Sequence, residues 1–527
     1  MVTVVEMPFQ WSMAWGLVLG VVFLWWAVRV LDWAWLKPKR LGRELRAQGL
    51  RGTEYRFFYG DLTENARLNK EAQSEAMPLS HDIIPRVAPL FHRAMEENGK
   101  ICITWHGPNP RVTISDPALV REVLANKFGH FEKPVINPLT RLFATGLASC
   151  EGEKWARHRR ILNPAFHHEK LKRMLPAFAT CCSELISRWQ KSVGFDGSFE
   201  LDVWPELLNL TGDVISRTAF GSSYAEGRRI FQLQQEQVEL AVQALQTLYI
   251  PGYRFLPTKN NRRMKEINRE VGALVKGIIG KREKAIKMRE ASSNDDLLGF
   301  LMESNLKHSQ ENNDASNAKM TTEEVIEECK LFYFAGQETT AVLLTWTMVA
   351  LSMHPTWQDK ARREVLQVFG NDCPSLSDGL SRLKIVTMIL YEVLRLYPPA
   401  TVLVRKTFKR MELGGITYPP GVMLSLPIIF IHHDPDVWGK DAGEFNPARF
   451  AEGISKATVD GQVAFFPFGW GPRTCIGQSF ALLEAKMALT MILYNFSFQL
   501  APSYAHAPYL VATLHPQYGA QIKLQSL

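Results

Sequence analysis

The ten residues from Phe468 to Gly477 carry the clearest chemical signal in this sequence. They read Phe-Gly-Trp-Gly-Pro-Arg-Thr-Cys-Ile-Gly, and the residues that follow have a helical pattern. Cys475 is therefore expected near a helix N-terminus, where free N–H groups and the helix dipole favour a thiolate. With Arg473 two residues earlier to pair with an anionic edge of a cofactor, such a thiolate suits axial ligation of a haem iron.

The same segment resembles the cysteine-ligand loop of the haem-thiolate monooxygenases, the cytochromes P-450. A lone buried cysteine is ordinarily an inert small hydrophobe, but the neighbours of this one match the family pattern FxxGxRxCxG. The resemblance implies that Cys475 is the metal ligand of a haem b, and that Phe468, Arg473 and Gly477 bind the cofactor.

Two further segments resemble motifs of the same family. Glu392 and Arg395 match its ExxR pattern, two charges at i,i+3 on one helix face, and Arg449 matches the arginine that joins them. A buried glutamate between two arginines is tolerable because every charge is paired, and removing one charge would strand the others. We expect Glu392, Arg395 and Arg449 to form a structural cluster.

The segment Ala335–Thr340 resembles the family's oxygen-activation motif, AGx[D/E]T[T/S]. Gly336 weakens a helix by about 1 kcal/mol relative to alanine, and its missing side chain is expected to open room over a cofactor face. The Thr339 hydroxyl can bond back to the i−4 carbonyl or leave it and hold a water, and Glu338 can pass protons inward. Thr339 and Glu338 are the predicted catalytic residues, and Ala335 and Gly336 are predicted to border the cofactor.

The resemblance assigns three more residues to the haem propionates. Trp155 and Arg159 match the family's WxxxR pattern, and Arg405 aligns with a propionate-binding arginine that many relatives carry. Two propionates in a mostly apolar pocket need compensating cations, so two or three arginines, Arg473 included, are a sensible set.

Residues 11–28 form an uncharged apolar run that, as an α-helix, spans about 27 Å, close to the hydrocarbon thickness of a bilayer. A cleaved signal peptide carries its basic residues before the apolar run, whereas here they follow it, so we expect an uncleaved anchor with the body in the cytosol. The predicted division is an anchor at 1–36 (helix about 11–31, stopped by Pro38), a basic hinge at 37–70 and a catalytic domain at 71–527.

The composition is that of a globular protein, with 46% hydrophobic residues, 22% charged residues and a net charge of +8. Seven scattered cysteines argue against a disulfide framework, and the mild basic excess suits an anionic membrane or an acidic protein better than a nucleic acid. A capping box at Thr321 and Glu324 predicts a long central helix to about Met353. Short β segments are expected at 100–105, 111–115 and 416–426, and a polar loop at 292–319.

The fold class is therefore mainly α, and the resemblance implies the triangular helical body of the family with small sheets, plus one transmembrane helix. The chain has no GxGxxG motif, so electrons are expected from a separate NADPH-dependent FAD/FMN reductase at the endoplasmic reticulum. A group of basic residues could dock that acidic partner or simply form a solvated helix face. These residues are Arg157, Arg160, Lys170, Lys172 and Arg173.

In finer detail the sequence is most similar to plant enzymes of family 72 and its clan. That similarity implies an isoprenoid-type substrate, such as a gibberellin or other diterpenoid or a triterpenoid, in an apolar pocket. Its walls are expected from residues 131–147, 248–256 and 401–403 and from the helix around Phe332. The alternatives are a herbicide hydroxylase, a haem-thiolate isomerase or dehydratase, and a non-catalytic haem protein. The isomerase class typically lacks the acid–threonine pair that Glu338 and Thr339 provide.

Overall fold

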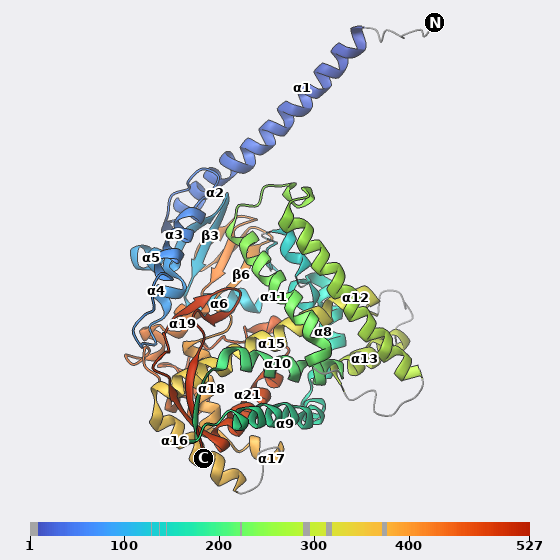
Figure 1. Cartoon of the computed structure of the whole chain (residues 1–527). Coiled ribbons are helices and arrows are strands. Elements are labelled where there is room, and N and C mark those ends of the chain that lie inside the picture. Colours follow the sequence, from blue (N-terminus) through green and yellow to red (C-terminus); the bar gives the residue numbers. More distant parts are fainter. Residues whose placement is uncertain are drawn as a thin grey trace.

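The computed structural model describes residues 9–127, 129–135, 137–143, 145–221, 224–287, 296–311, 319–370 and 377–527. One long helix projects away from the body, and the remaining helices surround a central one (Figure 1). The projecting helix, α1 (Phe9–Leu31), begins a stretch that is long and apolar enough to cross a membrane and is almost wholly exposed. The described residues contain one such helix, as predicted.

The prediction that Pro38 stops this helix is wrong. A π-helical turn, η1 (Asp32–Leu36), continues α1 into α2 (Lys37–Arg46), and Pro38 lies in the first turn of α2. The Lys37 N–H donates to the carbonyl of Asp32, five residues back. Proline fits at the start of a helix because the N–H that it lacks has no intrahelical partner there. The wider π turn thus lets the chain remain helical through the proline.

The segment expected as a hinge is folded onto the body. Tyr55 donates from its hydroxyl to the Ala34 carbonyl at 2.5 Å, and its ring packs against Trp35 and Trp105, with centroids 6.1 and 4.8 Å away. A Cβ at Gly42 would lie 3.0 Å from the Trp105 ring, so α2 sits directly on that indole. Residues 32–46 are therefore packed against the first sheet rather than forming a free connector.

The largest sheet contains β2 (Ile101–His106) and β3 (Asn109–Ile114), which confirms two of the predicted β segments. The third predicted segment, 416–426, forms two strands in different sheets. The six-stranded sheet has the order β1 (Arg51–Gly52), β2, β3, β9 (Met423–Leu426), β6 (Leu403–Thr407), β4 (Phe131–Glu132). The smaller sheets are β10 (Phe496–Leu500), β13 (Gln521–Ser526), β5 (Ser198–Asp202); β11 (Pro508–Leu510), β12 (Leu514–Pro516); and β7 (Met411–Leu413), β8 (Ile416–Tyr418).

Helices make up most of the body. Those of the first half are α3 (Leu62–Ala72), α4 (Ile84–Val87), α5 (Pro89–Asn98), α6 (Pro117–Ala125), α7 (Gly146–Ser149), α8 (Gly152–Leu162), α9 (His168–Lys191), α10 (Val203–Phe220) and α11 (Tyr224–Gln246). Those of the second half are α12 (Lys259–Lys287), α13 (Leu297–Glu311), α15 (Thr322–Met353), α16 (Pro355–Phe369), α17 (Ser377–Leu380), α18 (Lys384–Leu396), α19 (Ile428–His432), α20 (Pro435–Trp438) and α21 (Gln478–Asn495). Short 3-10 turns are η2 (Pro138–Leu142), η3 (Asn163–Phe166), η4 (Tyr253–Phe255), η6 (Pro447–Phe450), η7 (Ile454–Lys456) and η8 (Gly471–Arg473).

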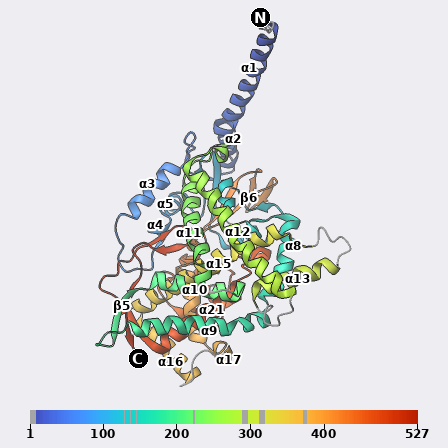
Figure 2. The same cartoon turned by 45° about the vertical axis from the view of Figure 1, so that its right-hand side comes forward.

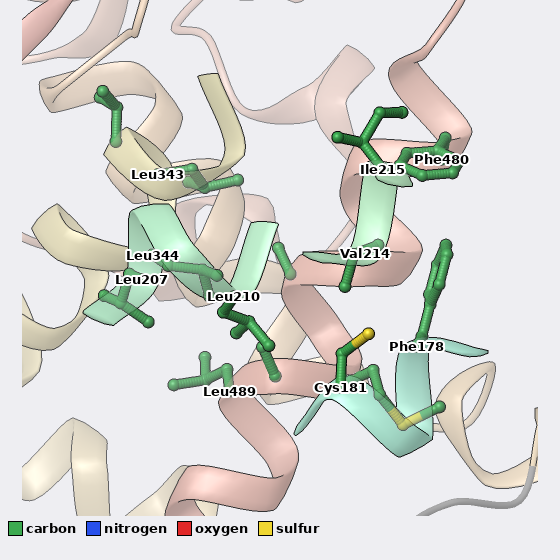
Figure 3. Packing of buried hydrophobic residues seen from close by; sticks show 14 of the residues in the cluster. Phe178, Cys181, Leu207, Leu210, Val214, Ile215, Leu343, Leu344, Phe480 and Leu489 are labelled. Carbon is green, nitrogen blue, oxygen red and sulfur yellow. The ribbon is translucent and has the colours of Figure 1, made fainter. Parts of the chain in front are cut away.

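The long central helix is present as predicted. α15 begins at the expected capping box, in which the Thr321 hydroxyl accepts from the Glu324 N–H and Glu324 accepts from the Thr321 N–H. Its second half, Thr340 to Leu351, is buried throughout. Figure 2 shows α15 in the middle of the body near α10 and α21, and Figure 3 shows apolar side chains of α9, α10, α15 and α21 meeting in one core.

The expected polar loop at 292–319 is partly wrong. Leu297 to Glu311 form α13, whose first turn buries Leu297, Leu298, Phe300 and Leu301 in the main core. Burial of these apolar side chains stabilises a helix here, although the rest of the segment is polar. Residues 292–295 and 312–318 lie outside the described residues.

Candidate active site

Cys475 lies in the tight loop that precedes α21. Its backbone N–H donates to the carbonyl of Phe468 at 2.8 Å, and the loop turns through Gly469 and Gly471 at φ 74° and 71°. A side chain at Gly471 would strike the Leu124 carbonyl at 2.8 Å, so glycine is required where the loop touches α6. Gly477 is the N-cap of α21. The loop therefore holds Cys475 at a helix N-terminus, as the spacing predicted.

The thiol of Cys475 faces a space inside the protein. Among the six cysteines that the structure describes, it is the exposed one. Burial nevertheless raises its pKa, while a hydrogen bond from the Gly477 N–H and the cations of Arg159 and Lys133 lower it. A side chain that is accessible and yet desolvated lies against an enclosed space rather than the outer surface.

The middle of α15 shows the same combination of exposure and depth. Six successive residues, Phe334 to Thr339, are half-exposed, although the helix is buried from Thr340 onward. Buried residues flank this segment on both sides, from Glu328 to Lys330 and from Thr340 to Leu351, so its accessible surface lies deep in the body. The Cys475 loop and the Ala335–Thr339 segment thus both retain accessible surface deep in the body.

Cations gather beside the Cys475 loop around one carboxylate, Glu151. Arg473 ion-pairs with Glu151, donates to the Cys150 carbonyl at 2.6 Å and lies 4.4 Å from the Trp155 ring centre. Burial, and then the neighbouring charge of Arg473, lowers the pKa of Arg405 to about 10. The structure therefore brings Trp155, Arg405 and Arg473 together.

Lys133 belongs to the same cluster and was missed from the sequence. Its backbone N–H donates to Glu151 at 2.9 Å and its ammonium donates to the Ala148 carbonyl. Burial, followed by the charges of Arg405 and Arg473, lowers the pKa of Lys133 to about 8. Nothing in the local sequence marks this lysine, because the cluster is assembled from residues far apart in the chain.

The donor set fits a haem. Lys133, Arg405 and Arg473 share the single carboxylate of Glu151, so the cluster carries surplus positive charge in a desolvated place. Arg159, which donates to the Thr474 carbonyl at 2.9 Å, adds a further cation beside the thiol. Two propionate carboxylates would neutralise this surplus, and Cys475 would hold the iron.

The structure also brings Glu392, Arg395 and Arg449 together. Arg395 donates from Nε and Nη2 to the two oxygens of Glu392, each at 2.8 Å, and both side chains are fully buried. Arg449 Nε lies 3.5 Å from Glu392 and its Nη2 lies 2.9 Å from Asp441. Asp441 is a fourth member that the motif alone did not indicate. Arg395 also donates to backbone carbonyls of the segment 432–444, so the cluster fixes the chain that leads into the cysteine loop.

Two neighbouring histidines have structural contacts. Nε2 of His432 accepts from the Phe466 N–H at 2.9 Å, and Nε2 of His433 meets the Leu396 carbonyl at 3.0 Å. Asp434, which follows them, caps α20 and pairs with Lys100 at 2.6 Å. These contacts give His432, His433 and Asp434 structural roles.

Side-chain hydrogen bonds supplement the helical backbone bonds in the middle of α15. The Thr339 hydroxyl donates to the Ala335 carbonyl at 2.8 Å, which is one of the two arrangements expected for it. The Gln337 carbonyl accepts from the Thr211 hydroxyl of α10 at 2.8 Å, and the Gln337 amide donates to Leu208 at 3.1 Å. These contacts join α15 to α10 at the level of the motif.

The role expected for the missing side chain of Gly336 is wrong. A Cβ there would lie 2.7 Å from Cγ1 and Cδ1 of Ile215 in α10. Ile215, rather than a cofactor space, therefore fills the volume that the glycine leaves free. Gly336 therefore allows α15 and α10 to approach each other closely. The expectation that its backbone borders the haem stays a prediction.

The carboxylate of Glu338 points to the C-terminal β hairpin. It accepts from the Thr513 hydroxyl at 2.9 Å and contacts Nε2 of His515. Sequence reasoning missed both partners, since they lie some 175 positions further along the chain. No local pattern connects such positions.

The segments predicted to form substrate walls are found in different surroundings. In the segment 131–147, Phe143 packs edge-to-face on Phe334 of α15, with the ring centroids 4.5 Å apart. This contact places the segment beside the half-exposed part of the helix. In contrast, Phe255 and Leu256 in the 248–256 turn are 71% and 52% exposed at the surface.

The mostly helical body, the cysteine loop and the cationic cluster together define a haem-thiolate protein. The sequence profile described as Cytochrome P450 matches residues 86–523. A solved structure titled "Retinoic acid bound cyanobacterial CYP120A1" matches with a TM-score of 0.71 and 25% identity, covering 85% of this chain and 96% of that one.

Curated plant proteins are much closer in sequence. "Cytochrome P450 CYP72A616" of Paris polyphylla is 66% identical, covering 95% of this chain and 96% of that protein. "Cytochrome P450 72A15" of Arabidopsis thaliana is 54% identical (97% and 98% covered), and "Echinocystic acid 23-monooxygenase" of Saponaria officinalis is 52% identical (95% and 97% covered). The chain belongs to the cytochrome P450 family, among its plant CYP72A members, and is a monooxygenase.

When bound, the haem supplies activation of dioxygen, with electrons from a separate NADPH-dependent reductase. The chain's own contribution would be to hold the thiolate through Cys475 and to neutralise the cofactor's carboxylates through Lys133, Arg405 and Arg473. The middle of α15 places the Thr339 hydroxyl and the Glu338 carboxylate.

Proposed function

We propose that this protein is a membrane-anchored monooxygenase that hydroxylates a triterpenoid or a related isoprenoid substrate. The observation that carries the proposal is the 52% identity, over nearly the full chain, to a relative named as an echinocystic acid monooxygenase. The half-exposed apolar surface around Phe334 and Phe143 agrees with a hydrophobic substrate. Gibberellins and other diterpenoids, and herbicides, are the competing substrate classes.

In this proposal Cys475 is the axial ligand of the iron. Lys133, Arg405 and Arg473 bind the propionates, together with Arg159 and Trp155. The geometry supports these roles through the surplus of desolvated cations beside the one exposed cysteine of the described chain. Thr339 holds a water when its hydroxyl leaves the Ala335 carbonyl, and Glu338 relays protons toward that water.

The proposed location is the endoplasmic reticulum membrane, with the body in the cytosol. Basic residues of α2 and beyond follow α1, whereas few charges precede it, and the positive-inside rule then orients the anchor. The turn between α11 and α12 lies at the end of the body from which α1 leaves (Figures 1 and 2). Its exposed Tyr253, Phe255 and Leu256 would touch the same bilayer.

The reductase is proposed to dock on the face of α8 and α9. Of the five basic residues considered there, Arg157 is occupied, because it pairs with Glu324 at 2.7 Å. Lys172 remains accessible at 47%, and its contact with Glu169 at 3.5 Å is a loose surface pair. Lys172 and the exposed Arg160 are therefore the candidates to exchange for acidic residues.

The test combines the full-length enzyme in membranes with an NADPH-dependent diflavin reductase and a panel of triterpenoids, gibberellins and herbicides. The expected result is a product heavier by one oxygen from a triterpenoid, formed only with NADPH and reductase and detected by mass spectrometry. Oxidation of gibberellins alone would replace the substrate class. A rearranged product of unchanged composition, formed without reductase, would contradict the monooxygenase role.

A further inference from the structure

The Glu338 carboxylate is held by a small group of residues on the β11–β12 hairpin. Thr513, in the turn between the two strands, donates its hydroxyl to Oε1 of Glu338 at 2.9 Å. Nε2 of His515, in β12, contacts the same oxygen and also lies 2.9 Å from the Thr513 hydroxyl. Two donors therefore converge on one oxygen of Glu338.

His515 is fixed from two other sides. Its ring packs against Trp204 of α10 with the centroids 4.8 Å apart, and against Tyr509 of β11 at 6.0 Å. The side chains of His515 and Glu338 are 17% and 13% accessible, so each is mostly covered but retains a route to solvent.

Among the described residues, the titratable neighbours of this pair include Tyr509 on β11. Burial and then the charges of Glu239 on α11 and Glu338 raise the pKa of Tyr509. Within the part of the chain that the structure describes, the ion pairs of Glu338 include His515 and no lysine or arginine. The side chain that can bring a proton to this carboxylate is therefore a histidine.

We propose that His515 is a positioning residue that orients the Glu338 carboxylate and reloads it with protons from solvent. The inference rests on the proposed role of Glu338 as the proton relay. A protonated imidazole transfers its Nε2 proton to Oε1 of Glu338, keeps the proton on Nδ1 and becomes neutral. The carboxylate becomes a carboxylic acid, and the ring regains one proton from water. Histidine suits this step because it gains and loses a proton near neutral pH.

Thr513 cannot replace His515 in this role. Its hydroxyl donates a hydrogen bond to Glu338, but it does not deliver a net proton at neutral pH. The pair therefore separates two functions, in which Thr513 contributes only orientation and His515 contributes orientation and the proton. Substitutions at the two positions distinguish these contributions.

The experiment uses haem-loaded, membrane-bound enzyme with reductase and compares His515→Gln, Thr513→Val and Glu338→Gln with the unmodified protein. Glutamine retains an N–H near the Nε2 position and so preserves the hydrogen bond without an exchangeable charge. His92→Gln is the matched control, since the partly exposed His92 pairs with Glu96 at 3.4 Å on α5. Product per NADPH, its pH dependence and the solvent isotope effect are measured.

For His515→Gln we expect product per NADPH to fall about 100-fold, the low end of the range for loss of a general acid, with a larger solvent isotope effect and a flattened pH profile. In a Glu338→Gln background the same change should add less than twofold, because the partner is gone. Thr513→Val should have a smaller effect and retain the pH profile, and His92→Gln should match the unmodified enzyme.

A second readout does not depend on turnover. The infrared carboxylate band that disappears in Glu338→Gln should shift with pH near neutrality in the resting enzyme, and this shift should be absent in His515→Gln. If His515→Gln retains normal coupling and the pH-dependent band, the proposal is overturned and the histidine only braces the hairpin. If Glu338→Gln itself has normal coupling, the relay role of Glu338 fails first, and the inference falls with it.

Discussion

Ile215 of α10 occupies the space that a side chain at position 336 of α15 would need. The distance from a Cβ at Gly336 to Cδ1 of Ile215 would be 2.7 Å, far shorter than any ordinary contact between carbons. The two helices therefore approach closely at the level of Gly336, where Thr211 also donates to the Gln337 carbonyl.

Gly336→Ala should consequently destabilise the protein, although alanine is the better helix former. We expect a loss of about 1–3 kcal/mol from overpacking, less the roughly 1 kcal/mol gained in helix propensity. Denaturant unfolding measures it. Combining Gly336→Ala with Ile215→Ala should cost less than the sum of the two single changes, and strict additivity would contradict the packing role.

Cys475→Ala should abolish the carbon monoxide difference band characteristic of thiolate-ligated haem. Among the described cysteines, Cys475 is the exposed one, whereas Cys102, Cys181, Cys182 and Cys329 are buried. Cys150→Ala is the control, since Cys150 lies nearby and is only half-exposed. Persistence of the band in Cys475→Ala would refute the ligand assignment.

Thr339→Ala should separate NADPH consumption from product formation and release hydrogen peroxide. The Thr339 hydroxyl bonds back to Ala335 at 2.8 Å, and Thr347, two turns later in the same helix, bonds back to Leu343 at 2.7 Å. Thr347→Ala removes the same kind of bond away from the motif and should leave coupling unchanged. Equal peroxide release from both variants would attribute the effect to helix stability alone.

Glu392→Gln should destabilise the fold by about 3–5 kcal/mol, because it leaves the buried Arg395 without its carboxylate. Arg449 would lose its second partner as well. Glu64→Gln is the control, since Glu64 pairs with exposed arginines of α3 and α5, where ion pairs contribute 0 to about 1 kcal/mol. Similar losses in the two variants would count against the buried cluster.

Acid should destabilise the protein through its buried histidines. Burial lowers the pKa of His81 and of His433 to about 3, and that of His106 and of His506 to about 4, whereas an unfolded histidine titrates near 6.5. Below about pH 6.5 these histidines are therefore protonated in the unfolded chain but stay neutral in the folded chain. Above that pH the buried histidines do not lower the free energy of unfolding. As the pH falls from about 6.5 toward 3–4, the free energy of unfolding decreases.

Within this window each such histidine lowers the free energy of unfolding by about 1.4 kcal/mol for every unit by which the pH falls. Denaturant unfolding at a series of pH values between 7 and 5 measures the slope. His81→Gln should reduce the slope, whereas His92→Gln, at a partly exposed position of α5, should leave it unchanged. An unfolding free energy that is constant over this range would exclude the effect.

Local patterns predicted the parts of the site that lie close together in the chain. The α15 capping box, the turn-rich loop before Gly477 and the i,i+3 spacing of Glu392 and Arg395 each specify their geometry within about ten residues. The physical reason is that hydrogen bonds and turns within one element are set by neighbouring residues.

The contacts that the sequence did not reveal join distant segments. Lys133 meets Arg405 and Arg473, His515 meets Glu338, and Ile215 meets Gly336, in each case through the packing of separate elements. The helix through Pro38 was missed for a different reason. A π turn has no strong local signature, and the usual rule for proline assumes α-helical bonding on both sides.

The aromatic packing of Tyr55 and Trp105 against residues 34–42 determines where the chain can be shortened for crystallisation. A protein that begins near Asp32 would lack the exposed apolar helix α1 but would keep the indole of Trp105 covered by α2. One that begins after Arg46 would strip that cover and expose Leu50 and the edge of the first sheet to water. The border between a well-behaved soluble version and an aggregating one therefore falls within α2, not at the end of the apolar run.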